Sequence, residues 1–580
     1  MLAENRSRLL DPTQSLAHGP WRVLLRGDEF ADISYRDRPV LRAIRAVVRD
    51  HDWRTLTARI ESVTDSHEGG TFTKTLEVRF AGFGSEYTAG LILRASDNEL
   101  TVSFDGRATQ DFSSNRIGLV VLHRPDDAGR DITVTSPEHT VTKSAFPTDI
   151  SPHQPFTNIA AMSWERDGTT FRLDFAGDVF ETEDQRNWTD ASFKTYSTPL
   201  SRPFPVSVRA GDRTQQSIRL SAKPWTANTT AAPRPSMPEV LTVRKQARGR
   251  VPALGTSASS SAINLPSVPG LASLIVEVPG NNPATAAEVL AQAGRQAQQL
   301  GTALDVRIVG KASAEIRSIV GLLPLEKVVR VGAFSSKEHV TEPELWQQLQ
   351  ATAKSRGFTG TLVAGTRSHF TELNRRPDSI RLDADEITYS ITPQMHATEV
   401  PHMVDSLPIQ RLTAMNALRL GSGRPLHVGP VTLKARFNAV STRGAYDPAT
   451  LEVMTTDPLQ ADEFTAAWLL GSINALTVPG VESITYFEAS GPRGLITAEG
   501  TTTPAFEILA KLATLRGADV LHVEGDVPGL VLYPVASEDG MVLFAANLTA
   551  ESLKTAAKLE NGYPRSFDIS PWSAVTKPLS

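Results

Sequence analysis

Residues 273–310 read SLIVEVPGNNPATAAEVLAQAGRQAQQLGTALDVRIVG. Two short apolar runs rich in β-branched residues, SLIVEV and ALDVRIVG, flank a segment whose apolar residues recur at helical spacing. This order predicts a strand, a helix and a second strand, which together form one βα unit of about thirty residues. Consecutive strands joined by a helix lie parallel, so the stretch predicts a parallel sheet with helical crossovers.

The same alternation continues downstream and fills residues 269–518. Further strands are expected at KVVRVGAF (327–334), GTLVAGT (360–366), ITYSITPQ (387–394), PLHVGPVTLKARF (425–437) and ESITYFEAS (482–490). About seven or eight strands in such a span predict a (β/α)8 barrel of the TIM type, with an open doubly wound sheet as the alternative. The segment between Glu488 and the helix expected at 504–517 is short, so the eighth strand is not placed.

The flanking segments have a different pattern. Residues 1–220 hold short runs that alternate apolar and polar residues, such as TLEVRF (75–80), and these predict an antiparallel β-sandwich. Residues 221–268 are rich in Pro, Ala, Ser and Thr, which is typical of a linker or an extended strap. Residues 519–580 return to strand patterns and predict a small C-terminal β region. We therefore expect a multidomain α/β plus β protein.

Composition and charge exclude several classes of function. A chain of 580 residues is too long for one hydrophobic core, so two or three domains are expected. A net charge of −5 without a long basic run argues against a nucleic acid partner. The absence of cysteine excludes thiolate nucleophiles, disulfides and iron–sulfur clusters.

The apolar segments of the sequence indicate where in the cell the protein is located and whether it binds a membrane. The N-terminal residues lack the apolar core of a signal peptide, and the apolar stretch near residues 464–478 is too short to span a bilayer. We expect a cytoplasmic protein with no membrane partner and no cofactor. The sequence leaves the oligomeric state open.

Two glutamates are candidate catalytic residues. In a (β/α)8 barrel the reacting groups lie just after the carboxyl ends of the strands. Glu372 follows the expected strand 360–366, and Glu488 closes the expected strand 482–490. Two carboxylates at one barrel mouth can divide the acid and base roles when their pKa values differ. Alternatively, each glutamate caps a helix or pairs with a neighbouring arginine, such as Arg375 or Arg493.

Other polar residues near strand ends are candidate substrate ligands. His396 follows the strand 387–394, and Arg436 ends the strand expected at 425–437, where a guanidinium can bind a hydroxyl, a carboxylate or an oxyanion. Asn374 lies beside Glu372. His396 and His402 do not form a metal motif, because Pro401 breaks the helix that would align them, so no metal is expected.

The densest polar segment lies outside the expected barrel, at EDQRNWTDASFKTY (183–196). We expect this segment to reach over the barrel mouth and bind a polyhydroxylated ligand, with Trp188 as a stacking platform. Its candidate ligands for the substrate are Asn187, Trp188, Asp190 and Lys194. The alternative is a polar corner that satisfies its own hydrogen bonds.

Motifs of other enzyme classes are missing from the sequence. It has no G-x-S-x-G elbow, no G-x-x-x-x-G-K-[ST] loop and no G-x-G-x-x-G after a strand. Serine esterases, P-loop enzymes and Rossmann oxidoreductases are therefore disfavoured.

Several long segments resemble the bacterial D-apionate lactonases. The resemblance rests on EDQRNWTDASFKTY, FTELNR (370–375), the ITPQMHA segment (391–397) and TYFEASGPRG (485–494), with ISPHQPF (150–156) and NRIGLVVLH (115–123) further upstream. It implies hydrolysis of D-apionolactone to D-apionate on a scaffold similar to the clan A glycoside hydrolases. A small sugar lactone would then be the substrate.

Carried over from that clan, Glu372 would take the acid/base position and Glu488 the nucleophile position. The clan usually has Asn directly before the acid/base Glu, whereas Thr371 stands there in this chain and Asn374 follows, which puts the role of Asn374 in doubt. The sequence leaves open whether water or Glu488 attacks the lactone. A glycoside hydrolase that uses the same glutamates and a non-catalytic carbohydrate-binding protein remain the alternatives.

Overall fold

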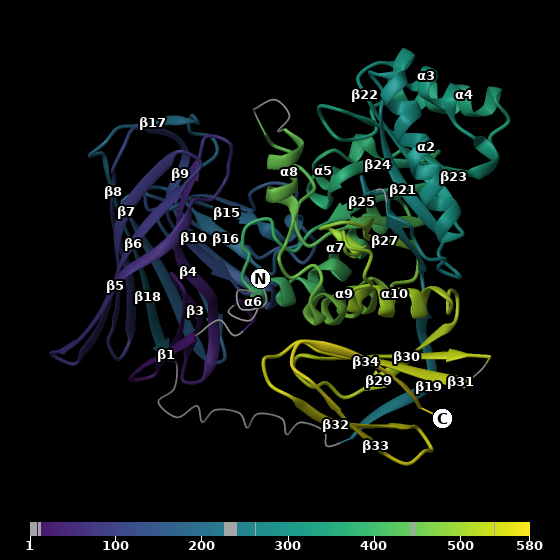
Figure 1. Ribbon diagram of the computed structural model, residues 1–580. Coiled ribbons are helices and arrows are strands. Elements are labelled where there is room, and N and C mark those ends of the chain that lie inside the picture. The colour runs from purple at the N-terminus through teal and green to yellow at the C-terminus, as the bar shows by residue number, and fades with distance from the viewer. Residues whose placement is uncertain are drawn as a thin grey trace.

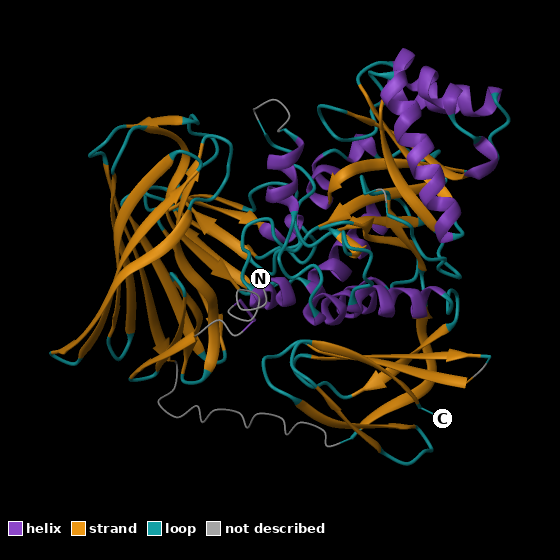
Figure 2. Ribbon diagram, in the orientation of Figure 1, coloured by secondary structure: helices purple, strands orange, loops and turns teal. Residues whose placement is uncertain are grey.

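The computed structural model describes residues 8–9, 13–224, 240–261, 263–441, 447–538 and 540–579. Figure 1 shows a purple to blue N-terminal region beside a teal to green central region, with a yellow C-terminal sheet below the latter. In Figure 2 the N-terminal region consists almost entirely of strands, whereas the helices gather around the central strands. The fold is thus a pair of antiparallel sheets, a (β/α) barrel and a C-terminal sheet.

The N-terminal domain is a sandwich of two sheets with one apolar core between them. Alternate residues of β6 are buried, as the alternation in the sequence predicts, and β6 pairs with β7 over its whole length. The inner side chains of both sheets, such as Phe30, Phe104 and Trp164, belong to the same core cluster. One sheet contains β1 (Thr13–His18), β2 (Trp21–Arg26), β3 (Glu29–Tyr35), β4 (Arg38–Asp50), β9 (Phe112–His123), β16 (Phe193–Tyr196), β15 (Phe180–Asp184) and β12 (Phe156–Ile159), and β17 (Val206–Val208) pairs with β9. The other contains β11 (Val141–Ala145), β10 (Asp131–Thr135), β13 (Ala161–Arg166), β14 (Thr169–Ala176), β18 (Arg213–Pro224), β8 (Glu99–Ala108), β7 (Ser85–Ala95), β6 (Thr71–Gly82) and β5 (Thr57–Glu68).

The central domain is a closed barrel of parallel strands. Eight strands within the described residues pair in sequence order, and the first of them, β20, also pairs with the last, β27, which closes the ring. The strands are β20 (Ala253–Ser257), β21 (Ser273–Pro279), β22 (Ala303–Gly310), β23 (Val328–Ser335), β24 (Thr361–His369), β25 (Glu386–Ile391), β26 (Leu426–Val431) and β27 (Val481–Ser490), and the short β28 (Gly494–Ile496) is added to β27.

Helices alternate with these strands along the chain, and most of them pack against barrel strands. They are α2 (Pro283–Leu300), α3 (Ser313–Leu322), α4 (Pro343–Ser355), α5 (Phe370–Arg375), α6 (Val400–Asp405), α7 (Leu407–Leu420), α8 (Pro448–Thr455), α9 (Glu463–Leu476) and α10 (Pro504–Ala513). Short 3-10 helices are η1 (Pro125–Asp127), η2 (Gln185–Trp188), η3 (Leu325–Lys327) and η4 (Pro377–Ser379). No helix among the described residues has the length and apolar character needed to cross a membrane.

Local sequence accounts for the limits of α2, the helix in the stretch that predicted the fold. The side chain of Asn282 accepts hydrogen bonds from the N–H groups of Ala284 and Thr285, and Pro283 occupies the first turn, where its missing N–H is not needed. Gly301 ends the helix with φ of 74°, a left-handed conformation that glycine adopts without strain.

The strand that closes the barrel comes from a segment expected to be a linker. Residues 221–268 contain the end of β18, all of β19 (Leu241–Arg250) and all of β20, while 225–239 lie outside the described residues. Leu254 of β20 is fully buried in the barrel core. The sequence of β20, ALGTS, is too short and too weakly apolar to stand out from its Pro- and Ser-rich surroundings.

The C-terminal sheet also takes a strand from this segment. β19 lies between β32 and β29, antiparallel to β29 and parallel to β32. The other strands are β33 (Arg565–Ile569), β29 (Asp519–Glu524), β30 (Leu530–Ser537), β31 (Gly540–Asn547), β34 (Ser573–Pro578) and β32 (Leu553–Leu559). Residues before and after the barrel therefore form one sheet, which packs against α9 through β31 and β34.

Candidate active site

The carboxyl ends of the barrel strands meet a segment of the N-terminal domain. The 3-10 helix η2, which joins β15 to β16, contacts α5 and α7 of the barrel. Figure 1 shows β15 and β16 reaching from the sandwich toward the barrel. The polar segment 183–196 thus lies against the barrel mouth, where the sequence led us to expect it.

Glu372 lies in the first turn of α5, directly after β24 ends. Its Oε2 atom accepts a hydrogen bond of 3.0 Å from the backbone N–H of His369. Burial raises the pKa of Glu372 to about 7, although backbone hydrogen bonds and the charge of Arg375 oppose the shift. Of the two alternative roles, Glu372 takes the helix cap, since it accepts from the N–H of the N-cap residue His369. The alternative ion pair with Arg375 is not formed, since that guanidinium approaches Glu183, with 3.8 Å between Nη2 and Oε1. Near neutral pH, Glu372 can therefore either donate or accept a proton.

Glu488 lies near the end of β27 and is held by Arg493. The chain turns at Gly491, with φ of 93°, and returns so that the N–H of Glu488 donates to the carbonyl of Arg493. The guanidinium contacts the Oε1 atom of Glu488 twice, through Nε at 2.8 Å and Nη2 at 2.6 Å. Burial raises the pKa of Glu488 while the charge of Arg493 opposes the shift. No described residue forms a hydrogen bond or ion pair with Oε2, so this oxygen is available to a ligand.

A third carboxylate at the mouth, Glu277, was not predicted from the sequence. It lies at the end of β21 and pairs with Arg367 of β24 and with Arg436. Burial opposes ionisation, but the two guanidinium groups hold the pKa of Glu277 well below its usual range. Its signal was present in the sequence, because Glu277 is the one charged residue within SLIVEV.

The position expected for Arg436 was wrong in one respect. β26 ends at Val431, so Arg436 lies in the following loop and not at the end of a strand. Its Nη1 atom donates to Oε1 of Glu277 over 2.8 Å, and its Nη2 atom donates to the carbonyl of Arg367. Its charge opposes the rise in the pKa of Glu488 and helps to lower the pKa of His369, so it lies near both of these residues.

Beside this cluster a recess of about 330 Å³ opens at the carboxyl ends of β21 and β22. Its walls include Glu277, Asn281, Lys311 and Arg367. This volume lies in the range of small-molecule sites and exceeds that of one monosaccharide lactone.

Two histidines from the barrel contact the N-terminal domain. His396, in the loop after β25, has its Nδ1 atom 2.7 Å from Oδ2 of Asp190. The ring of Trp188 lies 5.9 Å from that of His396 and 6.0 Å from that of His369. Burial lowers the pKa of His369 to about 3, so this ring is neutral at physiological pH. Trp188 is itself buried, so its ring packs against the histidines and does not form an open platform.

An ion pair of the N-terminal domain completes this side of the site. Lys194 Nζ lies 2.7 Å from Oε2 of Glu183, whose Oε1 accepts a hydrogen bond of 2.9 Å from the indole N–H of Trp188. Burial favours the neutral acid, but Lys194 and His396 hold the pKa of Glu183 well below its usual range. Lys194 thus forms an ion pair with Glu183 of the same polar segment, and the sequence analysis did not predict this pair.

Asn187 and Asn374 bind each other across the domain interface. Nδ2 of Asn374 donates to Oδ1 of Asn187 over 2.8 Å and to the carbonyl of Ile150 over 3.0 Å. Nδ2 of Asn187 donates to the carbonyls of Ser151 and Asp184. Both side chains are buried, and these bonds occupy both amide nitrogens and the amide oxygen of Asn187. Among the described residues, no donor binds the amide oxygen of Asn374.

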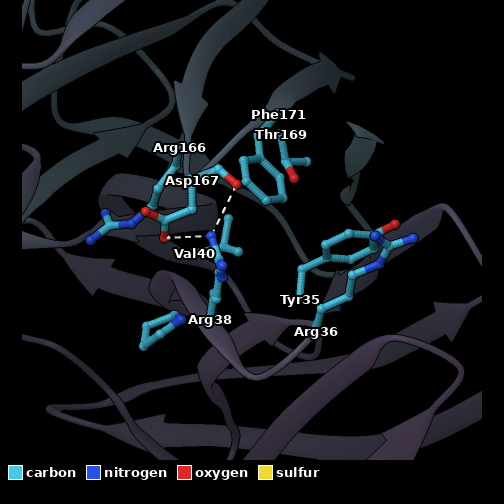
Figure 3. Close-up of a pocket in the computed structure, with 9 residues that line it drawn as sticks. Tyr35, Arg36, Arg38, Val40, Arg166, Asp167, Thr169 and Phe171 are labelled. Carbon is cyan, nitrogen blue, oxygen red and sulfur yellow. Dashed lines mark hydrogen bonds and ion pairs between the residues drawn. The ribbon is translucent and has the colours of Figure 1, made fainter. Parts of the chain in front are cut away.

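A further recess, shown in Figure 3, lies in the N-terminal sandwich. Arg38 reaches across it and donates to the carbonyl of Asp167 over 3.0 Å. It holds about 10 Å³, roughly the space of one water molecule, so it is too small for a sugar. As for metals, no group of three or more His, Asp or Glu side chains suited to an ion occurs in the described part of the chain.

Family models match two parts of this chain. Residues 1–224 match the N-terminal domain of D-apionate lactonase, and residues 267–517 match its TIM barrel domain. The chain belongs to the D-apionate lactonase family. A protein of Brucella anthropi named D-apionate lactonase is 27% identical over 534 residues, which cover 86% of this chain and 87% of that protein. Like the family it belongs to, the enzyme is a lactonase, which is a carboxylic ester hydrolase.

Solved structures show weaker similarity to this member of the D-apionate lactonase family. A glycoside hydrolase family 30 subfamily 8 xylanase from Clostridium acetobutylicum is 11% identical, with a TM-score of 0.40, over 58% of this chain and 99% of that chain. A galactose mutarotase-like protein from Lactobacillus casei is 10% identical, with a TM-score of 0.26, over 37% of this chain and 100% of that chain.

Proposed function

We propose that this lactonase opens D-apionolactone to D-apionate, with Glu372 as general acid and Glu488 as general base. The substrate is inferred from the name of the Brucella anthropi relative. The assignment of roles rests chiefly on the position of Glu372 directly after β24, where its partly buried surroundings raise its pKa to about 7. A carboxyl group with such a pKa is still protonated in much of the enzyme at neutral pH and can donate that proton.

Glu488 suits the complementary role. Arg493 fixes the side chain through Oε1 and favours the carboxylate form, which is the form that accepts a proton. Oε2 is then available to a water molecule placed beside the lactone. We favour attack by this water over a covalent acyl-enzyme, because a carboxylate held by a guanidinium is a weakened nucleophile.

The reaction balances as follows. Glu488 takes a proton from water as the water oxygen bonds to the lactone carbonyl carbon, and the carbonyl electrons move to its oxygen. Collapse of this tetrahedral intermediate breaks the bond to the ring oxygen, which takes the proton of Glu372 and becomes a hydroxyl group. The product acid then loses its proton to solvent to give D-apionate, and proton exchange with solvent returns Glu488 to the carboxylate and Glu372 to the acid. Arg436 is the candidate to stabilise the oxyanion, since its charge reaches both Glu488 and His369.

Hydrolysis followed by pH-stat tests this proposal. D-apionolactone should be opened, and Glu372→Gln and Glu488→Gln should each lower kcat by about 100-fold or more. Glu344→Gln provides the matched control, because Glu344 is exposed on α4 and forms no ion pair with the candidate site residues. Other aldonolactones and a set of aryl glycosides are measured in parallel. Turnover of glycosides without lactones, or full activity in both variants, would contradict the proposal.

A further inference from the structure

The geometry points to His396 as a hydrogen-bond acceptor that selects lactones carrying a hydroxyl group at one fixed position, with Asp190 of the N-terminal domain as its positioning residue. This inference rests on the proposed lactone substrate and deepens it. It also gives the N-terminal domain a part in substrate specificity, which would otherwise belong to the barrel alone.

The first step is the tautomer of His396. Nδ1 lies 2.7 Å from a carboxylate oxygen of Asp190, and a carboxylate can only accept. The proton of the neutral ring is therefore on Nδ1, and Nε2 carries a lone pair. Burial lowers the pKa of His396 although Asp190 opposes the shift, so the neutral form prevails at physiological pH.

The second step is the rigidity of the ring. The indole of Trp188 meets the imidazole edge to face, at an interplanar angle of 85°. Trp188 is fixed in turn through its hydrogen bond to Glu183. With one edge bound to Asp190 and one face packed on Trp188, the imidazole can aim Nε2 in a single direction.

The third step is what Nε2 can bind. No hydrogen bond to Nε2 is formed by the residues that the structure describes, and 16% of the His396 side chain remains accessible. Water can therefore reach Nε2, and a ligand that displaces this water leaves the lone pair satisfied only if it supplies a donor. Hydroxyl groups are the donors of a sugar lactone, whereas its carbonyl and ring oxygens only accept. With its lone pair on Nε2, His396 has no proton there to donate to an oxyanion.

The charges around His396 agree with a binding role. Lys194 and Arg49 face it from the N-terminal domain and disfavour a second proton, while Glu183 and Asp190 favour one. His369 lies across Trp188 on the barrel side. The positive charges of Lys194 and Arg49 offset the negative charges of Glu183 and Asp190. The imidazole of His396 therefore remains neutral when a polar substrate displaces water.

Specificity constants for a series of lactones test the inference. Each substrate lacks one hydroxyl of the preferred lactone. The unmodified enzyme should discriminate against one of these deoxy lactones by about 100-fold or more in kcat/KM, since a site built for a hydroxyl rejects its absence strongly. Asp190→Asn, whose amide can donate to Nδ1 and reverse the tautomer, should reduce that one discrimination by at least about tenfold. The effect should appear mainly in KM, with the other deoxy lactones unaffected.

Two further variants keep the test informative. His396→Leu should abolish the discrimination, and His396→Gln should keep part of it, because an amide oxygen also accepts. Asp149→Asn is the matched control, since Asp149 forms an exposed ion pair with Arg419 across the same interface. Nitrogen NMR of the protein with ¹⁵N-labelled histidine should show Nδ1 protonated, with a tautomer change in Asp190→Asn.

The outcomes separate this inference from the proposed function. An equal loss for every lactone, unchanged discrimination, or protonation of His396 at Nε2 in the unmodified enzyme would overturn the role of His396 alone. Failure of the unmodified enzyme to open any lactone would overturn the proposed function as well.

Discussion

Replacing Glu372 by glutamine should stabilise the barrel at alkaline pH while it removes activity. A pKa of about 7 in the folded chain, against an ordinary value of 4.5, means that the folded state holds the proton more tightly than the unfolded state. The wild-type protein therefore loses stability as pH rises from 4.5 through 7. Glutamine does not titrate, and its amide oxygen can still accept from the N–H of His369.

The size of the effect follows from the linkage between protonation and folding. The free energy of unfolding of the wild-type protein should fall by about 2 kcal/mol relative to Glu372→Gln between pH 5.5 and 8.5. For a domain the size of this barrel, that corresponds to a difference of about 4 to 8 °C in melting temperature.

Differential scanning calorimetry at both pH values measures this difference, read from the transition assigned to the barrel. Glu344→Gln, on the exposed face of α4, should show no change in melting temperature between the two pH values relative to wild type. If Glu372→Gln also shows none, the carboxyl group is already ionised at neutral pH, and its role as general acid loses its basis. The same titration predicts that kcat/KM of the wild-type enzyme declines as pH rises above about 7.

Three further outcomes test other parts of the structure. Arg493→Ala should raise the pKa of Glu488 and move the acidic limb of the kcat/KM profile to higher pH; an unshifted limb would show that Glu488 is not the base. Leu254→Ala in β20 should cost about 2 to 5 kcal/mol in denaturant unfolding, and a cost below about 1 kcal/mol would contradict its place in the barrel core. A double-mutant cycle of Asn187→Ala and Asn374→Ala should give a coupling of about 0.5 to 1.5 kcal/mol in stability, whereas a large rise in KM without coupling would show contact with the substrate instead.

Much of the fold could be predicted from the sequence because its signals are local. The strand and helix periods of 273–310 are confirmed by β21, α2 and β22. β20 was missed because its position depends on partners far along the chain. It pairs with β21 and with β27, and the latter lies more than two hundred residues away. Five residues of mixed polarity carry too little information to reveal such pairing.

Prediction of the candidate site from the sequence is limited for a different reason. Polar residues near strand ends can be found by their position, and the structure places Glu372 and Glu488 at the barrel mouth. Glu277 and Arg367 also lie at strand ends, but Glu277 stands within the apolar run SLIVEV, and Arg367, which directly follows the run GTLVAGT, was not considered as a site residue. Their pairing across the mouth is a tertiary contact that neither local pattern contains.

The polar segment 183–196 had two interpretations from the sequence, and the structure divides them between different residues. Asp184 and Arg186 bind each other, with 2.7 Å between Oδ2 and Nη2, and Arg186 donates to backbone carbonyls of its own domain, as in a polar corner. Asp190 instead binds His396 of the barrel. The density of polar residues in this segment could not separate these functions, because a side chain that fixes a loop and one that faces a ligand have the same polarity. What distinguishes them is whether each donor already has an acceptor within its own domain.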